Sequence, residues 1–357
     1  MNSLKEGGGG PTAWRTHLLA LPVAAGGGLL AYAVHMPLPW VLGAMLAVAA
    51  ASLLMGRTLT QKGVLRRAAQ GCIGLAIGLA FTPATWGLLG DLTLWIVLAA
   101  TTALVLSVLA APVIQRLAGM DGPTAIYAVA LGASSEMALQ AQRAGADGAS
   151  VACAHAVRII MVTGIVTFLA WMLGQPIAAS TALVSVAVVT LPHLLLLLAA
   201  AMLLALLIQR QNVPNPWLLG PLIVGGLGAM LSWGGRLPDA MLIAAQVMIG
   251  WALGQNITRS FFSRAPRVLA CAALVTLGIL AACLTMGWLI SWGSGLPLMT
   301  TFIALAPGGM AEMGVIAKTF GLGAPLVTAF HIVRIVSTVF LTQMLARWML
   351  SSGWVRH

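Results

Sequence analysis

A glutamate, a histidine and an arginine stand at a spacing that could place three chemically active groups at one site. Glu136 is followed nineteen residues later by His155, and Arg158 follows three residues after that. A carboxylate and an imidazole can exchange protons, and a guanidinium binds carboxylates and phosphates through several N–H donors. Because residues three apart share one face of a helix, His155 and Arg158 are expected to point the same way. The pattern predicts a polar site for an anion or a coupling proton.

The same set occurs a second time. Glu312, His331 and Arg334 repeat the first set at an offset of 176 residues and with the same internal spacing. Between residues 129–159 and 305–335, eleven of thirty-one positions are identical. This similarity predicts an internal duplication of the chain.

Composition indicates the class of protein. Of the 357 residues, 60% are hydrophobic and only 7% are charged, and the mean hydropathy is +1.01. A bilayer core of roughly 30 Å requires about 20 apolar residues per helix. The apolar runs are continuous rather than alternating, which disfavours a β-barrel and predicts an all-α polytopic integral membrane protein. The predicted segments are residues 17–34, 39–55, 66–88, 92–114, 122–145 and 149–174, and then 181–208, 216–234, 239–257, 268–291, 298–319 and 324–348.

Two of these segments are expected to be broken or re-entrant helices. Pro307 lacks a backbone N–H, and Gly308 and Gly309 are poor helix formers, so segment 298–319 is unsuited to an uninterrupted helix. By duplication, segment 122–145 should break at the corresponding place. The first copy has no proline or double glycine there, which predicts a weaker break and two functionally unequal halves.

The distribution of positive charge indicates how the halves are oriented. The chain has 18 Lys and Arg residues, and all except Arg158 and Arg334 are expected in loops and termini, which gives 16. If the two broken segments do not cross, each half crosses five times, and fourteen of these residues lie on the N-terminal side against Arg236 and Lys318 on the other. If all segments cross, the division is ten to six. The positive-inside rule therefore favours inverted repeats with a cytoplasmic N-terminus, a plan used by secondary transporters.

The two arginines are expected near the bilayer centre. Each lies about ten residues into its helix, or about 15 Å along it. Ionisable groups at that depth face the bundle interior or a cavity and pair with one another. We therefore predict that Glu136 pairs with Arg158 and Glu312 with Arg334, or that the pairing is crossed.

Two interpretations of these clusters remain open. In one, the ion pairs hold the broken helices in place and touch no substrate. In the other, a glutamate or histidine takes a coupling proton, an arginine holds an anionic group, and the amides of Gly308 and Gly309 donate to the ligand. Gln70 and Gln246, also repeated at an offset of 176, either line the same cavity or form hydrogen bonds between helices.

Other chemistries have less support. Two Glu and two His could bind a transition metal, but the adjacent arginines oppose a cation, so no metal and no cofactor are expected. The chain shows no serine elbow, P-loop or dinucleotide motif, so we predict that it is not an enzyme. Its net charge of +11 fits basic cytoplasmic loops better than nucleic-acid binding. Four cysteines without metal-ligand spacing are interpreted as packing residues: Cys72, Cys153, Cys271 and Cys283.

The predicted organisation follows the duplication. Pro39 and Pro216 each precede a tryptophan and are expected to open equivalent helices. The domains are a flexible cytoplasmic tail at 1–16, a first membrane repeat at 17–174, a connection at 175–192, a second membrane repeat at 193–350 and a C-terminal tail at 351–357.

The motif APGGMAEM at 306–313, together with the paired PW-x-LG segments, resembles the AbrB family of bacterial membrane proteins. That resemblance covers nearly the whole chain and implies a multi-pass protein of the bacterial cytoplasmic (inner) membrane. Members are labelled as regulators of gene expression or as ammonia monooxygenases. We expect a transporter of a small solute, with a membrane-embedded regulator or sensor as the alternative. The expected partners are the lipid bilayer and a small-molecule or ion substrate, without nucleic acid, and a homodimer is left open.

Overall fold

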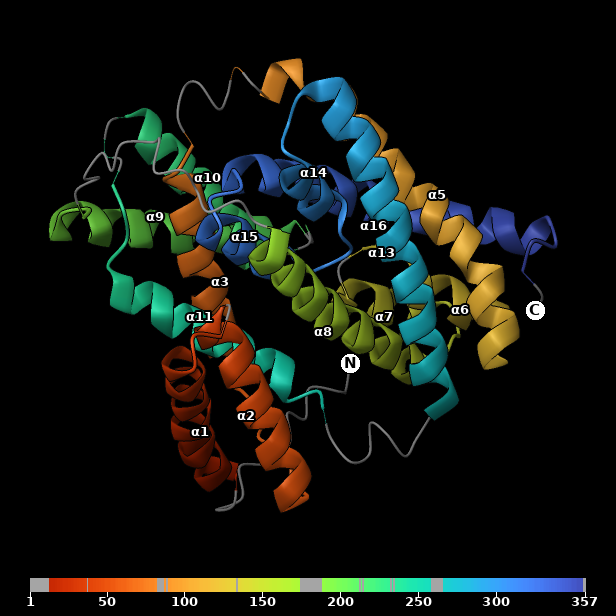
Figure 1. Cartoon of the computed structure of the whole chain (residues 1–357), viewed down its shortest axis with the longest axis horizontal. Coiled ribbons are helices and arrows are strands. Elements are labelled where there is room, and N and C mark those ends of the chain that lie inside the picture. Colours follow the sequence, from red (N-terminus) through yellow and green to blue (C-terminus); the bar gives the residue numbers. More distant parts are fainter. Residues whose placement is uncertain are drawn as a thin grey trace. The chain divides into compact units, whose positions relative to one another are not determined.

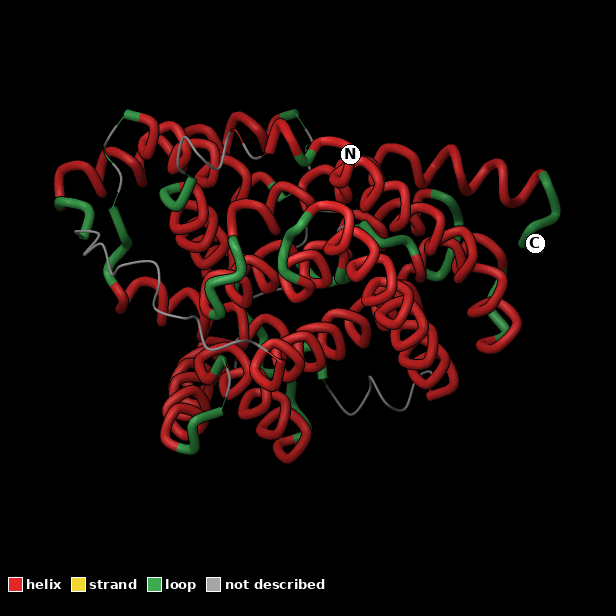
Figure 2. Tube along the Cα trace, turned by 45° about the horizontal axis from the view of Figure 1, so that its top comes forward, coloured by secondary structure: helices red, strands yellow, loops and turns green. Residues whose placement is uncertain are grey.

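The computed structural model shows a chain of α-helices joined by loops (Figure 1, Figure 2). It describes residues 13–36, 38–81, 87, 89–132, 134–173, 188–211, 213, 215–231, 233, 235–257 and 266–355. Within these ranges there is no β-strand, and the one strand-like pairing is an isolated bridge between Val188 and Arg236. The predicted all-α class is confirmed. Most of the predicted tail 1–16 and of the connection 175–192 lies outside the described residues.

Among the described residues, four helices are long and apolar enough to cross a membrane. In a bilayer, backbone N–H and C=O groups must be satisfied within the protein, and a helix satisfies them within one segment. The 20 to 29 residues of these helices meet the length of about 20 that a bilayer requires. They support a membrane-embedded protein. The four are α5 (Thr93–Ala118), α8 (Gly148–Leu173), α9 (Leu191–Arg210) and α13 (Pro266–Ser294).

Two proline-led helices begin where the sequence predicted. Helix α2 (Pro39–Met55) begins at Pro39 and α10 (Pro216–Met230) at Pro216, because proline fits the first helical position. The preceding residues, Leu38 and Asn215, both adopt left-handed backbone angles, with φ of 49° and 54°. The remaining longer helices are α1 (Ala13–Ala33), α3 (Gly63–Gly78), α11 (Asp239–Gly254) and α16 (Ala324–Ser351).

The chain forms two compact units, and the division between them falls within α3 and α11. Unit 1 consists of Met1–Ala69 and Ile243–Phe261. Unit 2 consists of Gln70–Leu242 and Phe262–His357.

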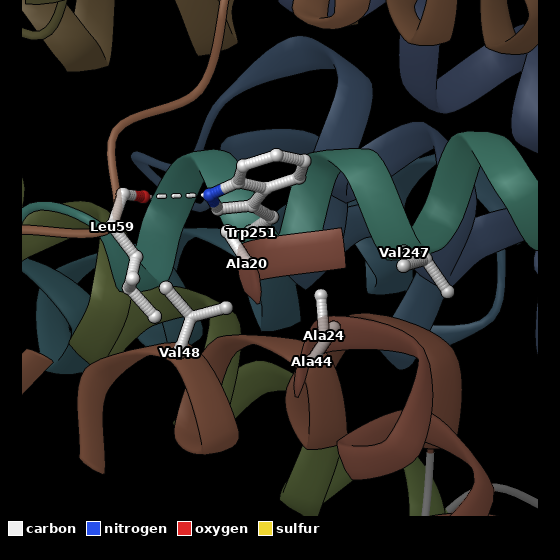
Figure 3. Close-up of a cluster of buried hydrophobic side chains, with 7 residues drawn as sticks. All are labelled: Ala20, Ala24, Ala44, Val48, Leu59, Val247 and Trp251. Atoms are coloured by element: carbon white, nitrogen blue, oxygen red, sulfur yellow. Dashed lines mark hydrogen bonds between the residues drawn. The ribbon is translucent and has the colours of Figure 1, made fainter. Parts of the chain in front are cut away.

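Unit 1 is built around the buried indole of Trp251 on α11 (Figure 3). Its Nε1–H donates to the carbonyl of Leu59 over 2.7 Å. Small side chains of α1 and α2 surround it, because only small residues let helix backbones approach closely. The cluster consists of Ala20, Ala24, Ala44, Val48, Leu59, Val247 and Trp251.

Replacing this indole tests the core of unit 1. Trp251→Phe keeps an aromatic ring but removes the Nε1–H donor, so the buried Leu59 carbonyl loses its partner. We expect a destabilisation of about 1–2 kcal/mol in an unfolding titration of the detergent-purified protein. The matched control is Trp288→Phe, because Trp288 on α13 is 57% exposed. Equal losses in both variants would contradict a specific contribution from the buried hydrogen bond.

Two glycines of α11 lie directly on the backbone of α2 within unit 1. A Cβ at Gly250 would collide with the carbonyl oxygen of Val41, and a Cβ at Gly254 with that of Met45. Such contacts are possible only without side chains at these two positions. The glycines therefore fix how closely α11 and α2 approach.

Within unit 2, α3 packs on α10 in the same manner. A Cβ at Gly74 would collide with the carbonyl oxygen of Leu218, and one at Gly78 with that of Leu222. Gly74 and Gly250 are 176 residues apart, and the carbonyls they meet, Leu218 and Val41, are 177 apart. The two helix pairs thus pack through the same kind of glycine-to-carbonyl contact.

Four long helices of unit 2 pack around four short ones. Helix α5 packs against α13 and α16, and α8 packs against α13. The short helices α6 and α7 lie on α8, and α14 and α15 lie on α16 (Figure 1). Their bounds are α6 (Gly122–Val129), α7 (Ser134–Arg143), α14 (Leu298–Leu305) and α15 (Met310–Thr319).

Candidate functional site

Both predicted breaks are present. Segment 122–145 forms α6 and α7, with residues 130–132 outside both helices, and segment 298–319 forms α14 and α15, separated at 306–309. The last residues of α6 and α14 are followed by Ala130 and Ala306, whose ψ angles of 124° and 134° turn the chain out of the helix in the same way. Both segments thus leave the helix at corresponding residues, and the weaker first break stays a prediction. Proline is not required, because tertiary contacts hold the backbone.

His155 and Arg158 on α8 hold the first break. The Nε2–H of His155 donates to the carbonyl of Tyr127 over 2.9 Å, and Arg158 Nη1 donates to the carbonyl of Ala130 over 2.9 Å. Arg158 Nη2 donates to His155 Nδ1 at 2.9 Å and reaches the carbonyl of Gly132 at 3.5 Å. Both side chains are buried. They satisfy carbonyls that the end of α6 leaves without helical partners.

His331 and Arg334 on α16 hold the second break through corresponding atoms. The Nε2–H of His331 donates to the carbonyl of Ile303 over 2.9 Å. Arg334 Nη1 donates to the carbonyl of Ala306 over 2.6 Å, and its Nη2 to that of Gly308 over 3.0 Å. Each donor and acceptor lies 176 residues after its counterpart in the first break. The predicted common face of histidine and arginine is confirmed in both helices.

The two clusters differ in how they use the histidine ring. His155 Nδ1 accepts a hydrogen bond from Arg158, whereas His331 Nδ1 is buried and has no partner among the described residues. The Nε atoms of Arg158 and Arg334 are likewise buried and unpartnered there. The two guanidinium groups are close enough to repel each other electrostatically. The two clusters thus place two buried guanidinium groups beside polar atoms that have no partner among the described residues.

Helices α5 and α13 also contact the breaks through residues that the sequence analysis did not assign to the site. The hydroxyl of Ser107 on α5 accepts a hydrogen bond from the amide of Leu131 over 3.2 Å. Cys283 on α13 donates its thiol to the carbonyl of Leu305 over 3.5 Å. These two residues are again 176 apart, so extending the comparison beyond residues 129–159 would have found them.

Glu312 lies at the second break, at the start of α15. It is buried, and its carboxylate occupies the position that a Cβ on Gly309 would take. A carboxylate in the first turn of a helix is stabilised by the partial positive charge of that helix end. The side chain of Glu136 lies outside the described residues. The predicted ion pairs of Glu136 and Glu312 with the arginines therefore stay predictions.

The amides of the second break were predicted to bind ligand. The amide of Gly308 donates to the carbonyl of Ala306 over 2.9 Å, while its own carbonyl accepts from Arg334. Gly309 precedes α15 with extended backbone angles. Gln70 and Gln246 are half-buried, and their place in a shared cavity stays a prediction.

Asp147 fixes the start of α8, the helix that carries the first cluster. Its amide donates to the hydroxyl of Thr124 over 2.9 Å, and its carboxylate accepts from Ser150 Oγ over 2.5 Å and from the Ala149 amide over 2.9 Å. The bond from Ser150 is the main cause that lowers the pKa of Asp147 below 3.8. Because the folded pKa is the lower one, this stabilisation is complete above the unfolded value and is lost as pH falls through the folded value.

The described residues contain no group of three His, Cys, Asp or Glu side chains placed to hold a metal ion. The family model described as "Transition state regulatory protein AbrB" matches residues 40–350, which include both breaks and both clusters. The chain belongs to the AbrB family.

Two relatives match this chain along most of its length. A Bacillus subtilis (strain 168) protein named "Uncharacterized protein YhjN" is 24% identical over 347 residues, covering 90% of each chain. An Escherichia coli (strain K12) protein named "Putative regulator AbrB" is 27% identical over 327 residues, covering 88% of this chain and 91% of its own. The AbrB-family region of this chain therefore spans both units.

Proposed function

We propose that this AbrB-family protein is a secondary transporter of a small anionic or zwitterionic solute. The single observation that carries the proposal is the pair of buried arginines, Arg158 and Arg334. Each donates to corresponding backbone carbonyls at a helix break, and the two guanidinium groups repel each other. Ionisable residues at membrane depth are costly and are retained mainly where they serve a substrate or ion pathway.

The proposal includes two inverted repeats that alternate access to this site. Corresponding hydrogen bonds at an offset of 176 support the repeats, as does the exchanged packing of α5 on α16 and of α8 on α13. The fourteen-to-two distribution of loop Lys and Arg residues supports inversion. Broken helices that meet at a repeat interface are where transporters of this plan bind substrate.

Charge favours an anion as the ligand. The guanidinium groups of Arg158 and Arg334 repel each other electrostatically. Glu312 is the one buried carboxylate among the described residues. An anion between the arginines would offset their repulsion and engage the unpartnered Nε atoms. His331 Nδ1 can accept a proton or a donor group of the ligand, and Glu312 is the other candidate for a coupling proton.

The rest of the proposal follows the same reasoning. We place the protein in a bacterial cytoplasmic (inner) membrane with its N-terminus in the cytoplasm, because the basic loops then lie inside. We assign it no enzymatic activity, and as partners the bilayer and a small-molecule or ion substrate, without nucleic acid.

A membrane-embedded regulator or sensor is the second candidate. The names of the family model and of the Escherichia coli relative favour it. A sensor would bind a ligand at the clusters and change conformation without moving the ligand across the membrane. Flux therefore separates the two candidates.

The test measures flux through the purified full-length protein in proteoliposomes. Radiolabelled acetate, succinate, glutamate and phosphate would be supplied under an imposed proton gradient, with methylammonium as a cation for comparison. The variants are Glu312→Gln, which removes a charge, and Gly309→Ala, whose Cβ displaces the Glu312 carboxylate without changing any charge. Gly164→Ala is the control, because a Cβ there meets nothing within 4 Å.

We expect at least one anion to be taken up by the wild type and by Gly164→Ala. Uptake should fall about tenfold or more in the other two variants, which corresponds to a loss of about 1.4 kcal/mol in differential binding. Anion binding without flux would replace transport by the sensor. Uptake of methylammonium alone, or uptake that is insensitive to Glu312→Gln and Gly309→Ala, would contradict the proposed anion site.

A further inference from the structure

Unit 2 contains a polar cavity that is separate from the two clusters. Its volume is about 320 Å³, and it lies between α6, α7 and α16. The polar groups in its wall are Tyr127 on α6, Gln140 and Arg143 on α7, and Arg347 on α16. The remaining wall is formed by Pro123, Ala144, Ala346 and Leu350.

Two guanidinium groups from different helices meet at this cavity, and no carboxylate is among the described residues that line it. Arg143 and Arg347 are both exposed, and neither forms an ion pair among the described residues. Asp121, which precedes α6, is exposed and forms no ion pair there either. Asp147, beyond α7, is bonded to Ser150. The charge of the two arginines is therefore available to a ligand.

Helix ends alone do not account for this charge. Arg143 lies in the last turn of α7, where a cation stabilises the helix dipole, and Arg347 lies four residues before the end of α16, outside its last turn. Each helix end carries only about half a negative charge, so two full positive charges exceed what both ends require. The excess favours an anion in the shared cavity.

Tyr127 adds a hydroxyl to the same wall. Its side chain is buried, and Arg347 is close enough to interact with it electrostatically. The backbone carbonyl of Tyr127 accepts the hydrogen bond from His155, so the cavity borders the first helix break.

The polar groups of this cavity are not repeated in the other half of the chain. At an offset of 176, Ile303 corresponds to Tyr127, Thr319 to Arg143, and Trp171 to Arg347. The cavity is therefore a feature of one half only, unlike the His and Arg clusters. A feature that the duplication does not explain calls for a separate role.

We propose that the Arg143/Arg347 cavity is a binding site for a small oxyanion group, a carboxylate or a phosphate. Two guanidinium groups supply forked N–H donors for its oxygen atoms, and the Tyr127 hydroxyl supplies a further donor. The volume fits a small metabolite or a single headgroup. The group belongs either to a free solute or to an anionic lipid, since both present the same oxygen atoms.

The experiment uses the full-length protein in nanodiscs of phosphatidylcholine alone. Binding of inorganic phosphate and of succinate is measured by titration calorimetry. In parallel, nanodiscs that contain phosphatidylglycerol are used to measure lipid retention by native mass spectrometry. The variants are Arg143→Gln, Arg347→Gln and Tyr127→Phe. Arg116→Gln is the matched control, because Arg116 is an exposed arginine in the last turn of α5 that does not line the cavity.

We expect the wild type and Arg116→Gln to bind phosphate or succinate, or to retain phosphatidylglycerol. Either arginine variant should weaken this binding at least tenfold, and Tyr127→Phe should weaken it a few-fold. Binding of the free anions identifies a solute site, and retention of the lipid alone identifies a headgroup site. Both arginines are exposed, so folding of the variants is expected to be unchanged and is checked by their melting temperatures.

The proposal is overturned if neither anion nor lipid binding depends on Arg143 and Arg347, or if Arg116→Gln weakens binding equally. Glu312→Gln separates this site from the transport site. Anion binding in the cavity should survive Glu312→Gln, whereas anion binding at the clusters should survive Arg347→Gln. If one of the two proposed sites does not bind anions, the proposal for the other site is still tested by its own variant.

Discussion

Arg334→Ala is expected to abolish solute flux and to destabilise the protein by about 3 kcal/mol or more. The guanidinium donates to the carbonyls of Ala306 and Gly308 at 2.6 and 3.0 Å. Without it, these buried acceptors have no donor, and each unsatisfied group costs about 1–3 kcal/mol. The space left by the side chain adds a cavity cost. The break between α14 and α15 should lose its fixed geometry.

The free energy of unfolding of each variant is measured by an unfolding titration in mixed detergent. Solute flux of the same variants is measured in proteoliposomes. Arg210→Ala is the control, because Arg210 is an exposed arginine in the last turn of α9, and it should change the free energy of unfolding by less than about 0.5 kcal/mol. Arg334→Lys keeps the charge but cannot serve two carbonyls as a fork, so an intermediate loss is expected. A stable Arg334→Ala protein with normal flux would show that the arginine neither holds the break nor meets the solute.

Gly250→Ala is expected to destabilise unit 1 by about 1–3 kcal/mol, the usual range for overpacking. The new Cβ would collide with the carbonyl oxygen of Val41 and lie 2.9 Å from the Cβ of Ala44. The atoms that it meets belong to the backbone of α2 and to a short side chain. No rotamer change can therefore relieve the contact, and α11 must move away from α2.

Gly278→Ala is the matched control for this prediction. Gly278 lies inside α13, and a Cβ there meets nothing within 4 Å. Alanine is the better helix former by up to about 1 kcal/mol, so the control should be neutral or stabilising. The melting temperatures of both variants are compared with the wild type. If Gly250→Ala melted at or above the control, the close approach of α11 and α2 would not be needed for stability.

Much of the architecture was predictable from local sequence. Pro39 and Pro216 open helices because the restricted φ of proline fits a first helical turn. The break at Pro307 was predictable for the converse reason, since proline and glycine are the poorest residues for a helix interior. His331 and Arg334 lie on one face because a helix brings residues three apart together.

The partners of these side chains were not predictable in the same way. Both arginines donate to backbone carbonyls at the breaks, and the sequence analysis did not name these carbonyls as partners. Sequence shows which groups carry charge, but a buried guanidinium is satisfied by whichever acceptors the fold places within about 3 Å. Only the tertiary structure placed Ala306 and Gly308 there.

The first helix break, after α6, was also not predictable from local sequence. Leu131 and Ala133 give no local reason for a helix to stop, yet α6 ends at Val129. Contacts from Arg158 and Ser107, far away in the chain, hold the backbone open. Sequence by itself determined the all-helical membrane-type class and the common face of each His and Arg pair, because these depend on composition, spacing and helical periodicity. The tertiary structure decided the first break, the arginine partners and the Arg143/Arg347 cavity, because each depends on groups that only folding brings together.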